Sequence, residues 1–163
     1  MPDNPEIDIV QQAGNWPDKR AIAALTEKAI SVTIDVASLK LRQNSELSVV
    51  LSNDDEVQAL NKSWRKIDKP TNVLSFPVEN ILVGEVPGML LGDIVLSFET
   101  ITREAENQGV SFDNHFLHLV IHGFLHIFGY DHTDDKEAVE METLEISCLS
   151  RLGIANPYND DIV

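Results

Sequence analysis

The sequence predicts a single α+β domain, in which a small mixed four-stranded sheet packs with about five helices, one of them a buried central helix. Four short strand patterns are interspersed with helical patterns but do not alternate strictly with them, which is typical of a mixed sheet. Residues 112–128 would be apolar nearly all round a helix, so this helix must be buried. With 163 residues, 43% of them hydrophobic, the chain has material for one core.

The strands are expected at residues 6–10, 46–52, 73–76 and 92–98. Residues 6–10 alternate polar and apolar side chains, as half-buried strands do, and Pro77 is expected to end the third strand or leave it at a sheet edge. Helices are expected at residues 17–39, 53–66, 99–108, 112–128 and 135–152. Two of them start with capping pairs, Asn53 with Glu56 and Asp134 with Glu137.

The remaining segments are predicted to be irregular. Residues 77–92 contain Gly84, Pro87 and Gly88 and should form a mobile surface loop. Residues 156–163 contain a proline and two aspartates and should be a frayed C-terminal tail, which leaves one domain over residues 1–155.

Composition excludes several classes of protein. The net charge of −15 argues against a protein that coats nucleic acid over a broad surface. The most apolar stretch is too short for a membrane span, and the acidic N-terminus does not resemble a secretion signal, so we expect a cytoplasmic protein without a membrane partner. The single cysteine, Cys148, excludes an internal disulfide and should be a core thiol.

Three histidines form the most informative motif, HGFLHIFGYDH at residues 122–132. His122 and His126 lie one turn apart on a helix, about 40° around its axis, so their imidazoles project side by side. Gly129 can end the helix and carry His132 back over the same face. Alternatively, His122 and His126 could be core histidines bonded to backbone carbonyls, but three buried imidazoles without a shared partner would cost several hydrogen bonds.

We therefore predict a site for one metal ion per chain on these three histidines. Three imidazoles leave one tetrahedral vertex of Zn²⁺ open for water, as in catalytic sites, whereas structural sites have four ligands. Another divalent transition metal could bind the same ligands. His118 lies too far along the helix to join them and is predicted to support a ligand or the core, and His115 is predicted to lie at the surface.

The spacing of the three histidines is also that of the metzincin peptidases, which carry a glutamate as general base after the first histidine. In this chain Gly123 occupies that position and cannot accept a proton. Peptidase chemistry would therefore need a carboxylate from elsewhere, such as Glu99.

The chain resembles the YbeY-type bacterial endoribonucleases in three blocks, residues 61–77 (NKSWRKIDKPTNVLSFP), 91–95 (LGDIV) and 122–132. The resemblance spans residues 45–152 and implies an α+β fold, a three-histidine zinc site, and cleavage of single-stranded RNA in ribosomal RNA maturation and ribosome quality control. It also implies a functional role for Arg65. The chain departs from the family at Asn72, where many members have aspartate, so we assign Asn72 no catalytic role.

Four of the twelve basic residues lie close together, namely Lys62, Arg65, Lys66 and Lys69. On charge alone they would be a solvated helix end, but the resemblance favours phosphate binding, with Arg65 as a catalytic residue that stabilises charge on a phosphodiester. Asp131 could orient a histidine ligand.

The predicted function is therefore a metal-dependent endoribonuclease that acts on ribosomal RNA, with the small ribosomal subunit or associated proteins as partners. The alternatives are a zinc peptidase or amidase, and a ribosome-assembly factor without catalysis whose metal only stabilises the fold.

Overall fold

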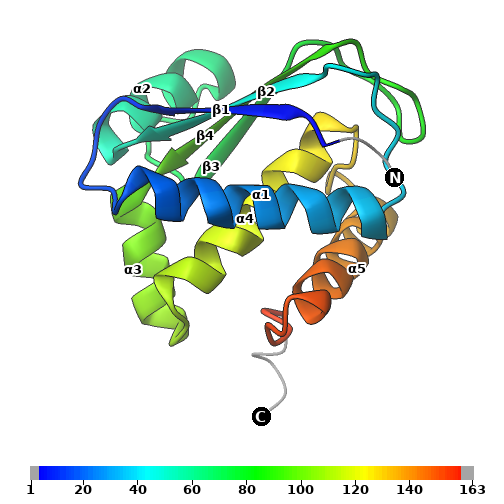
Figure 1. The fold of residues 1–163 in the computed structure, drawn as a ribbon. Helices are drawn as coiled ribbons and strands as arrows, with labels where there is room; N and C mark the ends of the chain where they lie inside the picture. Colours follow the sequence, from blue (N-terminus) through cyan, green and yellow to red (C-terminus); the bar gives the residue numbers. More distant parts are fainter. Residues whose placement is uncertain (1–3, 159–163) are drawn as a thin grey trace.

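The computed structural model describes residues 4–158, which contain four strands and five α-helices (Figure 1). In chain order these are β1 (Glu6–Gln11), α1 (Lys19–Val36), β2 (Glu46–Ser52), α2 (Asp54–Arg65), β3 (Val73–Pro77), β4 (Leu90–Ser97), α3 (Phe98–Gln108), α4 (Phe112–Ile127) and α5 (Asp135–Arg151). The predicted α+β class is confirmed. Within the described residues, no helix is both long and apolar enough to cross a membrane.

The sheet has the order β1-β2-β4-β3, with β1, β2 and β4 parallel and β3 antiparallel to β4. It is therefore mixed, as predicted. Pro77 is the last residue of β3, and β3 is an edge strand. An edge position tolerates proline because the missing N–H breaks no ladder hydrogen bond there.

The two faces of the sheet are covered unequally. Helices α1, α3, α4 and α5 lie on one side and α2 lies on the other (Figure 1). The larger core includes Leu47, Ile94 and Phe116, and the smaller one, beneath α2, is formed by Val57, Leu74 and Val95. Full burial of an aliphatic or aromatic side chain contributes roughly 1.5–3 kcal/mol, so the larger core dominates stability.

Several helix boundaries follow from local chemistry. The Asn53 side chain accepts a hydrogen bond from Glu56 N at 3.0 Å, and Asp134 Oδ1 accepts one from Glu137 N at 2.8 Å, so both predicted caps are confirmed. Helix α1 is shorter than predicted. Pro17 precedes its N-cap, and its C-terminal end comes at Val36 because Ser38 has a positive φ of 52°.

Helix α4 is the apolar helix that the sequence indicated, but it is not buried on every side. Its buried residues are His115, Phe116, Leu117, Leu119, Val120, Ile121, Gly123, Phe124, Leu125 and Ile127. His118, His122 and His126 remain partly accessible on the face that is left. Accessibility on that face is what allows a ligand to reach these histidines.

Cys148 is fully buried in the larger core, as predicted. Burial raises the pKa of its thiol to about 11. The thiol is therefore protonated at neutral pH and has no nucleophilic role.

The prediction that His115 lies at the surface is wrong, because only 4% of its surface is exposed. Helix α3 packs beside α4 and brings Glu104 Oε1 to 2.8 Å from His115 Nε2. The same carboxylate oxygen accepts a hydrogen bond from Asn72 Nδ2 at 2.9 Å. Burial alone would raise the pKa of Glu104, but these hydrogen bonds outweigh it and lower the pKa, so the carboxylate is charged and joins α3, α4 and the start of β3.

Gly123 marks the closest approach of α4 to the sheet. A Cβ atom at this position would lie 3.0 Å from Ser75 Oγ, 3.1 Å from Ile94 Cγ2 and 3.3 Å from Val73 Cγ2. Any side chain there would push the helix away from β3 and β4.

We expect Gly123→Ala to lower the free energy of unfolding by about 1 kcal/mol, because overpacking, at roughly 1–3 kcal/mol, outweighs the gain in helix propensity of at most about 1 kcal/mol. Gly123→Val should lower it further. Urea denaturation of both variants measures the effect. Stabilisation by alanine would show that the contact with the sheet is not tight.

Asn72→Asp tests the polar network around Glu104. Two carboxylates at hydrogen-bond distance repel each other, which raises their folded-state pKa values above those of the unfolded chain. The stability lost relative to wild type should therefore be about 1–3 kcal/mol at pH 7 and should shrink as the pH falls to 4, because the folded state, whose pKa values are higher, takes up protons before the unfolded chain does.

Urea denaturation at the two pH values measures this difference. The matched control is Asn72→Asp combined with Glu104→Gln, which removes one of the two charges and should recover most of the loss. Equal stability of Asn72→Asp and wild type at pH 7 would contradict the prediction.

Candidate metal centre and cleft

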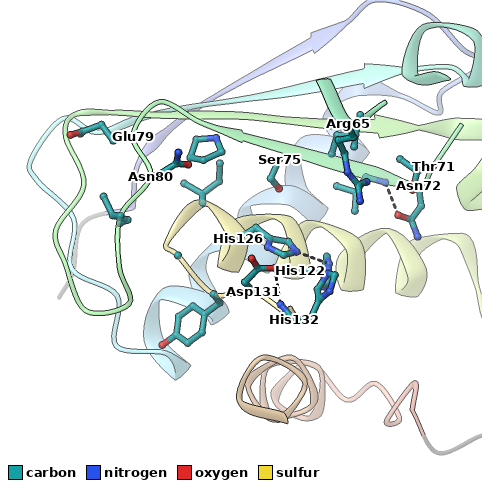
Figure 2. Close-up of a pocket in the computed structure, with 17 residues that line it drawn as sticks. Arg65, Thr71, Asn72, Ser75, Glu79, Asn80, His122, His126, Asp131 and His132 are labelled. Carbon is teal, nitrogen blue, oxygen red and sulfur yellow. Dashed lines mark hydrogen bonds between the residues drawn. The ribbon is translucent and has the colours of Figure 1, made fainter. Parts of the chain in front are cut away.

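Three imidazoles converge at the C-terminal end of α4. His122 and His126 project from the helix, and Gly129, with φ of 93°, turns the chain so that His132 returns toward them (Figure 2). A Cβ atom at position 129 would also lie 2.5 Å from Ile81 O, so glycine is required both for the turn and for the approach of the β3–β4 loop. One ring nitrogen from each histidine lies within 4.8 Å of the others.

The chemistry of this donor set fits a metal ion. The Nε2 atoms of His122 and His126 are 3.1 Å apart, close to the roughly 3.3 Å expected between two nitrogens on a tetrahedral ion with bonds of 2.0–2.1 Å. Burial and the neighbouring His122 and His132 lower the pKa of His126 to about 4. Its imidazole is therefore neutral at pH 7, as metal binding requires.

Glu145 supports this cluster from α5 and was not predicted from the sequence. Its side chain is 1% exposed, with Oε2 at 3.0 Å from His122 Nδ1 and Oε1 at 2.6 Å from His118 Nε2. Burial would raise the pKa of Glu145, but the hydrogen bonds with His118 and His122 lower it to about 2. The ionised carboxylate favours a proton on Nδ1 of His122, which leaves Nε2 free to bind a metal.

The role predicted for His118, support of a ligand, agrees with its contact with Glu145. A signal for Glu145 itself was present in the sequence. It lies on the same face of α5 as Met141 and Cys148, both of which are buried. A glutamate on an apolar helix face needs a partner, and the three histidines were the available candidates.

Tyr158 also contacts Glu145 and His118. Its hydroxyl donates a hydrogen bond to Glu145 Oε1 at 2.7 Å and lies 3.2 Å from His118 Nε2. Burial and the nearby Glu145 carboxylate raise the pKa of Tyr158, so the hydroxyl keeps its proton. Tyr158 belongs to the segment predicted to be a frayed tail, residues 156–163, of which residues 159–163 lie outside the described residues.

The histidines form one side of a cleft of about 670 Å³. Strand β3 and the β3–β4 loop supply other parts of its lining, among them Ser75, whose hydroxyl donates to the carbonyl of Gly123 at 2.8 Å. Arg65 also lines the cleft, and Figure 2 shows its side chain reaching toward the histidines. Arg65 Nη1 is 3.4 Å from Oδ1 of the buried Asn61.

The structure separates Arg65 from the other three basic residues, because none of these lines the cleft. Lys62 lies 4.0 Å from Asp68 in an exposed pair, and Lys66 adopts the left-handed conformation that ends α2. Lys69 is exposed, and its carbonyl accepts a hydrogen bond from Asn61 at 2.9 Å. The lysines are therefore exposed near Arg65 in sequence but do not enter the cleft.

The carboxylates proposed for peptidase chemistry lie elsewhere. Glu99 accepts a hydrogen bond from Asp54 N at 2.7 Å at the start of α2, and it does not line the cleft. Position 123 faces the sheet, so a glutamate there would not fit. Asp131 does line the cleft, but its Oδ1 accepts from the backbone N of His132 at 2.7 Å and so fixes the peptide of this histidine.

The comparisons with known proteins agree with this geometry. The family described as Endoribonuclease YbeY matches residues 6–153. A Sinorhizobium medicae protein of that name is 44% identical over 160 residues, which cover 95% of both chains. A Bartonella bacilliformis protein of the same name is 45% identical over 154 residues, which cover 94% of this chain and 97% of that protein.

A Thermotoga maritima protein solved in solution has the same overall fold, with a TM-score of 0.55 and 25% sequence identity over 90% of this chain and 91% of that one. The likeness in sequence thus covers nearly the whole chain, including the cleft and its histidines. The chain belongs to the YbeY endoribonuclease family.

Proposed function

We propose that this protein is a zinc-dependent endoribonuclease that hydrolyses single-stranded RNA. The observation that carries the proposal is the presence of three converging imidazoles and one arginine in the same cleft. Membership of an endoribonuclease family supports RNA as the substrate. Ribosomal RNA in the cytoplasm is the proposed target, with the small ribosomal subunit or associated proteins as partners.

In this proposal, His122, His126 and His132 hold one zinc ion, and another divalent transition metal could replace it. When bound, such an ion supplies a Lewis acid and a water of lowered pKa. Glu145 keeps His122 in the tautomer that presents Nε2 to the cleft, and the burial of His126 keeps its imidazole neutral.

Arg65 binds the phosphodiester on the open side of the histidines. A guanidinium can donate two parallel hydrogen bonds to phosphate oxygens, and it can stabilise the extra negative charge of the pentacoordinate transition state. Its contact with the buried Asn61 orients the side chain before substrate arrives. Lys62, Lys66 and Lys69 are proposed to bind phosphates of neighbouring nucleotides.

A phosphodiester suits this cleft better than a peptide bond. Peptide hydrolysis requires a carboxylate as general base near the metal, and the two carboxylates that line the cleft already hold backbone groups. Glu79 accepts from Gly88 N at 2.9 Å, and Asp131 accepts from His132 N. A purely structural metal would require a fourth protein ligand, and the described residues show three.

Cleavage of single-stranded RNA by the purified protein, measured beside hydrolysis of peptides, tests the proposal. Arg65→Ala should lower kcat/KM on RNA by about 10²–10³-fold, as the loss of one donor to a transition-state oxyanion does. His126→Ala should abolish cleavage and lower the zinc content from one ion per chain.

The matched control is Lys28→Ala, which removes an exposed positive charge on α1, far from the cleft in sequence, and should leave cleavage unchanged. Cleavage unaffected by Arg65→Ala and His126→Ala would overturn the proposed mechanism. Peptide hydrolysis without RNA cleavage would favour the peptidase. RNA binding without cleavage by the folded, zinc-loaded protein would favour an assembly factor.

The contact of Glu145 on α5 with His122 gives a second prediction. Glu145→Gln removes the charge that orients His122 and should weaken zinc binding by about 10–100-fold. Tyr158→Phe should weaken it less, because Glu145 keeps both histidine contacts. Competition with a chromophoric chelator measures the affinity without reference to activity.

Glu140→Gln is the matched control, since Glu140 is exposed on the same helix and the substitution removes the same charge. Its zinc affinity should equal that of wild type. Equal affinities for Glu145→Gln and Glu140→Gln would exclude a role for Glu145 in metal binding.

A further inference from the structure

Trp64 is the most exposed aromatic residue near the cleft. Its side chain is 71% exposed on the last turn of α2, directly before Arg65. The other tryptophan, Trp16, is 8% exposed and donates its indole N–H to Ser52 O at 3.0 Å. Trp64 buries little apolar surface, so core packing does not account for it.

The indole of Trp64 is nevertheless held in place. Its ring packs edge-on against Phe76, with centroids 5.9 Å apart and planes at 63°. Phe76 lies on the edge strand β3 between Ser75 and Pro77, and both of these neighbours line the cleft. Trp64 is thus held against Phe76 of the edge strand that borders the cleft, on the side of the sheet that α2 covers, while most of its surface faces solvent.

The charge around Trp64 is opposite to that of the whole protein. Lys62, Arg65 and Lys66 lie within two residues of it, although the net charge of the chain is −15. Exposed aromatic rings among basic side chains form the combination with which proteins bind single-stranded nucleic acid, since the bases stack on the rings and the cations bind the phosphates. Positive charge also disfavours a basic peptide as the occupant.

We propose that Trp64 is a stacking platform for an unpaired base of the RNA strand, next to the phosphate bound by Arg65. This inference rests on the proposed function for the identity of the strand. A paired base within a duplex has its faces covered by neighbouring base pairs, so the platform selects unpaired RNA. Loss of one stacked base weakens binding by roughly 5- to 150-fold.

The chain has two tryptophans, and this makes the test direct. The zinc-loaded protein is titrated with a phosphorothioate octauridylate, which keeps the charges of RNA and resists hydrolysis. Stacking on Trp64 should quench part of the tryptophan emission in a saturable way, whereas Trp16 is buried and should not respond. An abasic strand with the same linkages should bind more weakly and cause no quenching.

Fluorescence anisotropy of a labelled octauridylate then measures affinity. Trp64→Ala should weaken binding by roughly 5- to 150-fold, and Trp64→Phe should stay close to wild type because phenylalanine can also stack. The salt dependence separates stacking from charge. Trp64→Ala should leave the slope of log K against log salt unchanged, whereas Arg65→Ala should reduce it by about 1.

Val139→Ala is the matched control, because Val139 is 63% exposed on α5 and lies outside the cleft. The inference would be overturned if the abasic strand bound wild type as tightly as the octauridylate does and quenched the emission. It would also be overturned if folded Trp64→Ala bound the octauridylate as tightly as wild type. If wild type still cleaves RNA in that case, the proposed function stands and Trp64 serves another partner. If wild type neither binds nor cleaves RNA, both the function and the platform are excluded.

Discussion

The close packing of α4 against β3 and β4 is the constraint on which the rest of the site depends. At Gly123 the helix comes so near the sheet that a single methyl group would meet three side-chain atoms within 3.3 Å. This contact fixes the rotation of α4. Its apolar residues then face the core, and His122 and His126 face the cleft, which places two imidazoles opposite β3 and Arg65.

A second constraint is electrostatic. Glu145 carries a negative charge at 1% exposure, and such a charge is tolerated only when hydrogen bonds replace its hydration. His118, His122 and Tyr158 supply these bonds from α4 and from the segment after α5. The same bonds that stabilise the buried carboxylate also fix the orientation of His122, so stability and the geometry of the histidine cluster are coupled.

The net negative charge of the chain and its local cluster of basic residues would affect RNA in opposite ways. A net charge of −15 repels nucleic acid from most of the protein. Arg65 and the nearby lysines are a local exception in this charge, and the proposed stacking on Trp64 would add a contact that salt does not screen.

The sequence by itself determined the class of fold, the four strands and five helices, the capping residues and the three histidines. These features follow from local rules, because the hydrophobic period, the helix caps and the i, i+4 spacing each involve residues within one or two turns of one another. The same rules placed His115 at the surface and missed Glu145. Both errors arose because the partner lies on another helix, Glu104 on α3 for His115 and the histidines of α4 for Glu145.

Tertiary structure alone decided which of the four clustered basic residues enters the cleft. Arg65 lines it and the three lysines do not. It also decided that position 123 faces the sheet and that Tyr158 returns to Glu145. The burial of a side chain, the compensation of its charge and its access to the cleft depend on packing between segments distant in sequence. No local pattern encodes this packing.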